Sequence, residues 1–381
     1  MNFELTEEQA LIQEAAKEFS DKYVAPRIFE IDETNSIPQE LVDQIIELGF
    51  VGIPHPAEYG GAGSDYLSYI LVLEQIARNC TGICGVITTN NLAVNAIKMF
   101  GTEEQKQKYL PDLCTGKKSS TFVFTEPSTG SDHNQIETTA VLDGDYWILN
   151  GVKRFATGAE KEGPITLFAR DDQSNGITAF TLDKFCEGYS ISEPWAKSGY
   201  KGNKTYDVFL DDVRIPKENM LGELGKGFMI LQQNVGFGKI SISAVALGRA
   251  QGALEASIEY AKTRIQRGKP ITSFPTLRFR LANMAAKVEA CRWMVYRLGF
   301  LASQAKTPEL RAALAIESAK TKLFVTENSY DVVRDAVQVH GSYGVTKEFK
   351  VEIMLRDCAV AELIEGVKDV QAMLVGGAIT H

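Results

Sequence analysis

Hydrophobic positions in the first third of the chain recur at helical spacing. Thr6 with Gln9 forms a capping-box pattern that predicts a helix start, and the apolar positions that follow share one helical face: Leu11, Ile12, Ala15, Phe19 and Val24. Similar patterns predict helices after Ser36-Ile37-Pro38, over Tyr66–Ala77, around Asn91–Met99, and from Thr102 to near Pro111. Residues 1–120 are therefore expected to form an N-terminal α-helical domain.

From Ser120 onward the pattern changes to short runs that are typical of β-strands. These runs cover residues 121–124, 138–141, 146–149, 165–169, 177–182 and 205–210. Asp143-Gly144-Asp145 joins two of them like a hairpin turn. Several short strands separated by turns predict a small β-barrel or sandwich, which we expect over residues 121–225.

After Gly225-Lys226-Gly227 the pattern becomes helical again, and residues 226–381 are expected to form a helical bundle. Apolar residues alternate at spacings of four and three and so make one stripe along a long helix: Leu277, Leu281, Met284, Val288, Cys291, Val295 and Leu298. We interpret this stripe as bundle core. It could also serve oligomerisation, and periodicity alone does not separate the two.

Composition and charge narrow the class of protein. The chain has 381 residues, 44% of them hydrophobic and 23% charged, which is typical of a globular protein of about two or three domains. A formal net charge of -9 without a basic run argues against nucleic-acid and anionic-membrane partners. The six cysteines are scattered, so we expect no metal site and no disulfide framework. The first residues show no signal or transit pattern, and no apolar run approaches the roughly 20 residues of a membrane span. A cytoplasmic location is the expectation.

Three motifs occur in a characteristic order. Residues 125–132 read T-E-P-S-T-G-S-D, a polar turn whose hydroxyls, backbone N–H groups and glycine suit a cofactor. Arg356-Asp357 lies downstream, and Glu365-Gly366 follows sixteen residues before the C-terminus. With the order helices, strands, helices, these motifs resemble the FAD-dependent acyl-CoA dehydrogenases over essentially the whole chain. The resemblance implies a mainly α fold with a central β domain: an N-terminal α-helical domain, a middle β-barrel and a C-terminal four-helix bundle.

The resemblance implies that Glu365 is the catalytic base, which removes the α-proton of an acyl thioester while hydride leaves the β-carbon for flavin N5. Such a proton is weakly acidic, so the base must be poised by partial desolvation. Leu363, Ile364 and Val367 could supply apolar surroundings, and Gly366 would let the backbone approach the substrate. An isolated Glu-Gly is more often a solvated helix end, but the spacing from Arg356-Asp357 favours the base.

The resemblance also implies a set of cofactor contacts. Phe124 and Thr125 would touch the flavin ring, and Ser131 would face phosphate or pantetheine. Residues 153–158 stand in place of the family's K-x-W-I-T-N, so Phe155 would pack on the flavin without an indole, while the Thr157 hydroxyl would reach N5. An ordinary β-domain loop and a core aromatic are the alternatives for these two segments.

Two further segments resemble parts that complete the FAD site of a neighbouring subunit. Arg264 would bind the pyrophosphate, and Gln338 with Gly341 would receive the adenine end, which implies a homotetramer. Five positions depart from the family pattern: Arg267, Pro275, Ser342, Val367 and Asp369. Most of them fall on the adenosine side of FAD, so these departures could weaken FAD binding.

A second departure touches the substrate. Gly236 and Lys239 replace the usual D-x-x-R, so only Lys239 keeps a charge that could help to fix acyl-CoA. Phe237, Asn90 and Asn91 could reshape the acyl pocket for a branched, cyclic or aromatic group.

We therefore expect an FAD-dependent acyl-CoA dehydrogenase that passes electrons to an electron-transferring flavoprotein. The same residues would serve an enoyl-CoA reductase running in reverse, because redox partner and substrate potential decide the direction. A non-redox elimination is a further alternative, against which Glu365 argues. A catalytically silent thioester-binding protein remains the alternative from a different class.

Overall fold

The N-terminal region is helical, as the sequence predicts. The computed structural model describes residues 4–380, and their first six α-helices are α1 (Glu7–Phe19), α2 (Ile28–Thr34), α3 (Gln39–Glu47), α4 (Tyr66–Ala77), α5 (Gly85–Phe100) and α6 (Glu103–Cys114). Thr6 and Gln9 form the predicted capping box of α1, and Thr102 with Gln105 forms another at α6. Helix α5 begins earlier than expected. Helix α6 continues past Pro111, because the chain turns only at Gly116, where φ is 76°.

The middle region is a single connected sheet of eight strands. Its members are β1 (Thr121–Val123), β2 (Thr139–Asp143), β3 (Tyr146–Thr157), β4 (Pro164–Asp171), β5 (Ile177–Asp183), β6 (Tyr189–Ile191), β7 (Thr205–Pro216) and β8 (Met220–Leu221). The order is β6-β7-β3-β2-β4-β5-β8, with β1 beside β4. Gly144 has φ 61° and makes the predicted hairpin turn. Strands β6 and β8 were missed because three and two residues are too short to show alternation.

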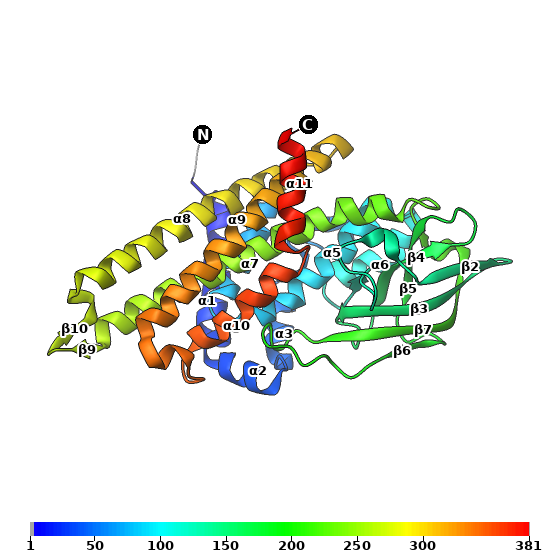
Figure 1. The fold of residues 1–381 in the computed structure, drawn as a ribbon. Helices are drawn as coiled ribbons and strands as arrows, with labels where there is room; N and C mark the ends of the chain where they lie inside the picture. The colour runs from blue at the N-terminus through cyan, green and yellow to red at the C-terminus, as the bar shows by residue number, and fades with distance from the viewer. Residues whose placement is uncertain (1–3, 381) are drawn as a thin grey trace.

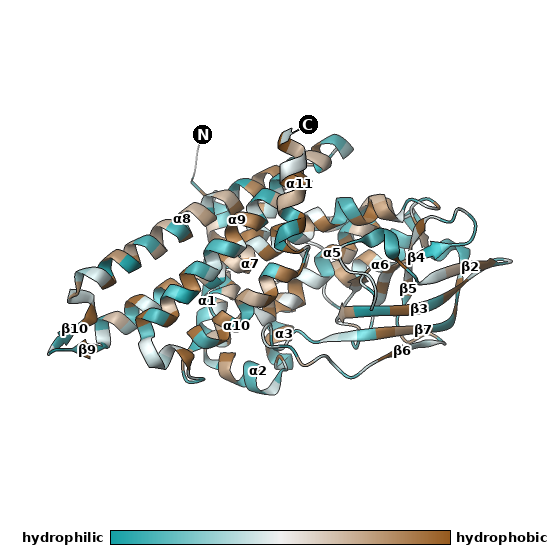
Figure 2. Cartoon of the chain, viewed as in Figure 1, coloured by the Kyte–Doolittle hydropathy of each residue, from teal (hydrophilic) through white to brown (hydrophobic). Residues whose placement is uncertain are grey.

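The C-terminal region returns to long helices, which Figure 1 shows as a bundle beside the sheet. They are α7 (Gly227–Thr263), α8 (Pro275–Gln304), α9 (Pro308–His340), α10 (Lys350–Leu363) and α11 (Lys368–Thr380). A small hairpin, β9 (Ile265–Gln266) with β10 (Lys269–Pro270), links α7 to α8. The predicted stripe is confirmed as core: Met284, Val288, Cys291, Val295 and Leu298 are all buried. In Figure 2 hydrophobic residues recur along the long helices between hydrophilic ones.

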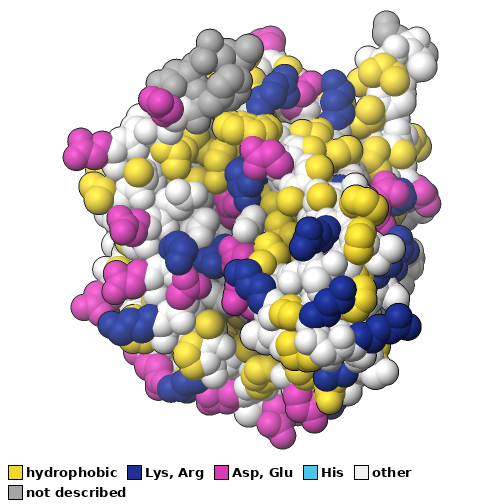
Figure 3. Space-filling view, turned by 90° about the vertical axis from the view of Figure 1, so that its left-hand side faces the viewer, with side chains coloured by type: hydrophobic (Ala, Val, Ile, Leu, Met, Phe, Trp, Pro, Cys, Tyr) yellow, Lys and Arg dark blue, Asp and Glu magenta, His cyan; other side chains and the backbone are white. Residues whose placement is uncertain are grey.

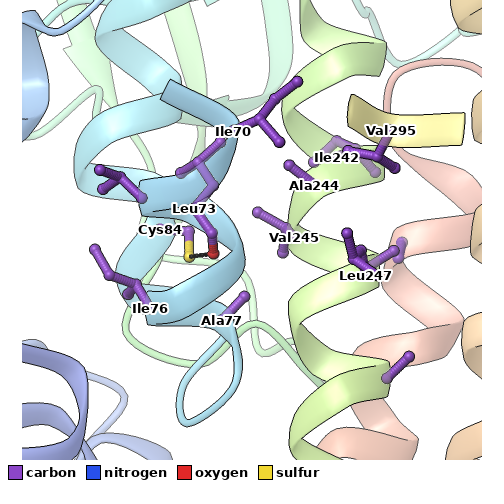
Figure 4. Close-up of a cluster of buried hydrophobic side chains, with 14 of the residues drawn as sticks. Ile70, Leu73, Ile76, Ala77, Cys84, Ile242, Ala244, Val245, Leu247 and Val295 are labelled. Atoms are coloured by element: carbon purple, nitrogen blue, oxygen red, sulfur yellow. Dashed lines mark hydrogen bonds between the residues drawn. The ribbon is translucent and has the colours of Figure 1, made fainter. Parts of the chain in front are cut away.

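The main core joins the first region to the last. Figure 4 shows Ile70 and Ala77 of α4 pointing toward Ala244 and Val245 of α7. Glycines make this contact close, because a Cβ at Gly248 would lie 2.2 Å from the carbonyl oxygen of Glu74, and one at Gly252 would lie 2.0 Å from that of Arg78. The backbone of α7 therefore packs directly against the backbone of α4 and the residue that follows it. This contact fixes the position of the helix that carries part of the candidate site.

Candidate active site

Glu365 lies in a sharp turn between α10 and α11. Its φ is 55° and that of Gly366 is 90°, so two consecutive residues adopt left-handed conformations. A non-glycine residue adopts this conformation at a cost and persists there only where its surroundings hold it. Lys322 of α9 supplies one such restraint, because its ammonium donates to the carbonyl oxygen of Gly366 over 2.7 Å. The turn thus directs the Glu365 side chain back into the protein.

The Arg356-Asp357 pair anchors the helix that leads to this turn. Arg356 forms an ion pair with Asp32 of α2 over 2.8 Å and also donates to the carbonyl oxygen of Ser198. The buried Asp357 carboxylate accepts from the backbone N–H of Tyr200 over 2.6 Å. Helix α10 is therefore fastened to both the N-terminal helices and the β domain, and this fixes the helix end from which the Glu365 turn starts.

The Glu365 carboxylate packs against α7 at a glycine. A Cβ built on Gly238 would lie 2.1 Å from Glu365 Oε2 and 2.5 Å from its Cδ. No larger residue fits at position 238 unless the carboxylate moves. Nothing in the residues around Gly238 signals this role, since the contact joins residues that are far apart in the chain.

Two lysines surround the carboxylate. Burial raises the pKa of Glu365 to about 7, and the charges of Lys322 and Lys239 oppose that rise. Burial in turn lowers the pKa of Lys322 to about 8 and lowers that of Lys239. The Lys322 ammonium is fixed by backbone carbonyls, whereas that of Lys239 makes no hydrogen bond or ion pair with residues 4–380. Glu365 is thus poised between its ionised and neutral forms near pH 7.

His133 connects the β domain to this cluster. Its ring lies 4.7 Å from that of Phe124, edge to face, and 6.3 Å from that of Phe228 on α7. Burial lowers the pKa of His133, and the charge of Lys239 lowers it further. Phe124, His133, Lys239 and Glu365 therefore bound one region between the sheet and the bundle. Sequence reasoning named three of the four and missed His133.

A buried ion pair fixes the segment that carries Phe124 and Thr125. Lys153 Nζ lies 2.6 Å from Glu126 Oε1, with both side chains almost fully buried. Glu126 also accepts from the backbone N–H of Glu137 over 2.6 Å. Next to this pair, the N–H of Arg154 donates to the carbonyl oxygen of Thr125 over 2.7 Å. The 125–132 and 153–158 motifs, separate in sequence, are thereby brought side by side.

The other expected flavin contacts lie in separate segments of the β domain. Thr157 ends β3 and lines a narrow hollow with Gly158, Thr89 and Asn203. Phe155 is 53% exposed, with φ 57°. Ser131 is exposed in the loop after β1, and no atom lies within 4 Å of a Cβ built on Gly130. Gly130 and the exposed Ser131 leave open space beside the 125–132 motif.

Arg264, Gln338 and Gly341 form a second group at the opposite end of α7. Arg264 caps this helix, and its guanidinium lies 5.7 Å from the ring of Tyr343. Gln338 and Gly341 are exposed at the end of α9. Since Arg264 comes 26 residues after Gly238, it lies roughly 39 Å along the helix. The structure does not bring this group together with Glu365 in one chain.

The asparagines near the expected acyl pocket differ from each other. Asn90 is occupied, because its Oδ1 accepts from the N–H of Ser120 over 2.8 Å and its Nδ2 donates to the carbonyl oxygens of Leu113 and Lys118. Asn91 is fully buried, and its Nδ2 has no hydrogen-bond partner among residues 4–380. Phe237 packs on Tyr66 with ring centroids 5.2 Å apart. Asn90 therefore ties α5 to the β domain.

The residues present fit a flavin. Phe155 offers an exposed ring and Phe124 a half-buried one, Thr125 and Thr157 offer hydroxyls, and Gly130 offers open space. Arg264 provides a guanidinium for phosphate at the other end of the helix. Within residues 4–380 no helix is both long and apolar enough to cross a membrane, and no three His, Cys, Asp or Glu side chains gather in a way that suits a metal ion.

Comparison with known proteins covers the whole chain. Residues 6–117, 121–213 and 225–380 match the N-terminal, middle and C-terminal domains of acyl-CoA dehydrogenases. The chain is 38% identical to a 3-(aryl)acrylate reductase of Clostridium sporogenes, covering 97% of this chain and 98% of the relative. It is 39% identical to the CarC subunit of the caffeyl-CoA reductase-Etf complex of Acetobacterium woodii, covering 98% of each. It is also 38% identical to a short-chain specific acyl-CoA dehydrogenase of Clostridium acetobutylicum, covering 100% of each.

Solved structures agree with these matches. The fold superposes on butyryl-CoA dehydrogenase of Megasphaera elsdenii with a TM-score of 0.95 and 35% identity over 100% of both chains. An acyl-CoA dehydrogenase of Bacillus anthracis solved with FAD gives a TM-score of 0.90 and 33% identity, covering 99% of this chain and 67% of the other.

Proposed function

The chain belongs to the acyl-CoA dehydrogenase family of flavin-dependent oxidoreductases that act on CH–CH groups, and from that premise we propose that Glu365 is its catalytic base. The observation that carries this proposal is the Glu365 carboxyl group, which is packed against Gly238 and has a pKa raised to about 7. A base with a pKa near the working pH combines a sufficient ionised fraction with a useful proton affinity.

In this proposal the chain's own residues carry out the following steps. The ionised Glu365 takes the proton from the α-carbon of a bound acyl thioester, and the C–H electron pair forms the α,β double bond as hydride leaves the β-carbon. FAD, when bound, supplies the acceptor for that hydride. Lys322 and Lys239 favour the ionised form of Glu365 before the reaction. Phe124, Thr125, Phe155 and Thr157 would hold the flavin ring, and Lys239, Ser131 and Gly366 would contact the thioester.

Reduction of an enoyl-CoA is a second candidate, which the same pKa favours. Near pH 7 part of the Glu365 population is protonated and can donate that proton to the α-carbon while hydride enters at the β-carbon. Two of the similar relatives are named as an arylacrylate reductase and as a subunit of a caffeyl-CoA reductase complex. An aromatic acyl group is accordingly among the substrates that we propose to test first.

Anaerobic titration of FAD-loaded protein with acyl-CoA esters tests dehydrogenation, and the return of flavin absorbance when enoyl-CoA esters are added to the chemically reduced protein tests reduction. Straight, branched, cyclic and aromatic acyl-CoA esters are added one at a time, and flavin bleaching at about 450 nm is followed. A substrate that bleaches wild-type protein but not Glu365→Gln supports the proposal. Equal bleaching by Glu365→Gln would place the base elsewhere. Protein that takes up no FAD would support the silent thioester-binding alternative.

We further propose a homotetramer whose electron partner is an electron-transferring flavoprotein. The separation of Arg264, Gln338 and Gly341 from Glu365 supports contact with a second copy, as do exposed apolar side chains on the outer helices, among them Phe279, Phe300, Met373 and Ile379. Figure 3 shows hydrophobic side chains exposed between charged ones at the end of the bundle. The partner is supported by the Etf complex named for one relative. Sedimentation and turnover with a purified flavoprotein acceptor test these two points.

The division into domains at residues 1–120, 121–225 and 226–381 and a cytoplasmic location remain proposals too. All six cysteines are free thiols, which suits a reducing compartment. Limited proteolysis tests the domain boundaries, and cell fractionation tests the location.

A further inference from the structure

Two large aromatic rings are exposed side by side at one edge of the β domain. Phe155 lies near the end of β3 and Trp195 lies between β6 and β7, with ring centroids 5.6 Å apart and an interplanar angle of 54°. Their exposed fractions are 53% and 39%. Large aromatic side chains in a globular protein are usually mostly covered, so a pair that leaves both rings accessible is a candidate contact surface.

Trp195 is held rigidly despite its exposure. Its Nε1–H donates to Asp207 Oδ1 over 2.9 Å, and its backbone N–H donates to the carbonyl oxygen of Thr205 over 2.9 Å. The guanidinium of Arg154 lies over the indole at 5.1 Å and pairs with Asp207 at 2.9 Å. Hydrogen bonds from Arg154 and Trp195 lower the pKa of Asp207 and keep it ionised. Two charged partners thus fix one orientation of the indole.

Phe155 needs a neighbour that holds it. Its φ of 57° is unfavourable for a non-glycine residue, and the pairing of β3 with β7 shifts register between Lys153 and Ala156. Arg154, the residue before Phe155, connects Thr125 to Trp195. Its backbone N–H donates to the carbonyl oxygen of Thr125, and its guanidinium lies over the indole of Trp195. Trp195 is therefore connected directly to the segments that the proposed function assigns to the flavin ring.

We propose that Trp195 is a positioning residue of the FAD site, which holds the ring of Phe155 against the flavin and supplies the indole that position 155 lacks. The inference rests on the proposed function, because it takes the flavin to lie at Phe155. The ligand class is the planar isoalloxazine, which stacks favourably on aromatic faces. None of the roles proposed above involves the Arg154–Asp207–Trp195 contacts.

Tryptophan emission gives a readout that does not depend on catalysis. The chain has three tryptophans, and Trp195 and Trp293 are nearly equally exposed, at 39% and 40%. FAD is added to apoprotein, and quenching is compared among wild type, Trp195→Phe and the control Trp293→Phe. We expect Trp195→Phe to lose a larger share of the quenching than the control. Equal quenching in the two variants would overturn the inference.

FAD affinity provides the second measurement. Trp195→Ala should weaken FAD binding about tenfold, or about 1.4 kcal/mol, whereas Trp195→Phe should restore most of the affinity because it keeps a ring beside Phe155. The matched control is Phe185→Ala: Phe185 is also 53% exposed and packs on Tyr189 at 5.6 Å, but it lies between β5 and β6. Wild-type affinity in Trp195→Ala, with native circular dichroism, would contradict the proposal.

The two proposals fail in different ways. Wild-type protein that binds no FAD would remove the proposed function and this inference with it. Wild-type protein that binds FAD and is bleached by an acyl-CoA, while both Trp195 variants behave like wild type, would remove only the role of Trp195.

Discussion

The two ends of helix α7 present opposite situations. Around Gly238 every group that acts on Glu365 comes from the same chain: Gly238 packs on the carboxylate, and Lys239 and Lys322 set its charge. At the other end Arg264 is half-buried and lies roughly 39 Å away along the helix, and the expected contacts Gln338 and Gly341 are exposed. Near Gly238 the described chain itself supplies neighbours for Glu365. The role proposed for Arg264 requires a second copy of the chain.

Proton transfer and cofactor binding therefore place different demands on the two ends of the helix. Proton transfer needs a desolvated carboxyl group with fixed neighbours, which a folded core supplies. Holding the far end of a long dinucleotide needs only exposed donors, which can lie on another subunit. Changes near Gly238 should therefore affect rate, and changes near Arg264 should affect cofactor affinity.

The largest expected effect is that of Glu365→Gln. Removal of the base should reduce substrate-driven flavin reduction by about 10²- to 10⁴-fold while FAD remains bound. Stopped-flow absorbance measures the rate. Glu362→Gln, one turn earlier and half-buried, is the matched control and should stay near wild type. Flavin reduction by Glu365→Gln at a rate near that of wild type would show that Glu365 is not the catalytic base.

Gly238→Ala should come next. Its new methyl group would overlap Glu365 Oε2, and because that atom ends a flexible side chain, the carboxylate should move while the fold remains. Displacement of a reacting group by about 1 Å costs on the order of 100-fold in rate. Gly236→Ala is the control, since its nearest atom would lie at an ordinary 3.8 Å. Equal rates in both variants would show that this contact is not catalytic.

Arg264→Gln probes the other end. Loss of a charged hydrogen bond to phosphate should weaken FAD binding by roughly 10- to 100-fold and leave the rate of the FAD-loaded enzyme near wild type. Lys262→Gln is the control, because Lys262 is exposed and pairs with Glu259. Wild-type FAD affinity should also fall when the protein is diluted below the dissociation constant of its subunits. Tight FAD binding by a monomer in sedimentation would contradict the role of a second copy.

The smallest effect is a change in pH dependence. Dehydrogenation needs the Glu365 carboxylate, so its rate should rise with pH through about 7, whereas enoyl-CoA reduction needs the acid and should fall over the same range. Lys239→Met should move the midpoint upward, because it removes one of two cations that favour ionisation; Lys239→Arg should restore it. The groups that face this pair are Lys322, Tyr69 and His133. An unchanged midpoint would remove Lys239 from the site.

The amino-acid sequence was enough to predict the order helices, sheet, helices, because periodicity and capping are local properties. Thr6 with Gln9, the Tyr66–Ala77 helix and the stripe from Met284 to Leu298 all match the structure. It also singled out Glu365-Gly366 and the 125–132 turn, because these motifs are continuous in sequence. Strands β6 and β8 escaped, since pairing partners rather than alternation define such short strands.

The surroundings of those motifs depend on how distant segments pack together. Gly238, His133, Lys322 and Trp195 come from four separate segments, and nothing in their local sequence marks them. The pKa of Glu365, the close contact at Gly238 and the distance to Arg264 all depend on which helices pack together. Burial and charge act through space, so they are set by the packing of the chain, whereas a helix or a turn is set by its own neighbouring residues.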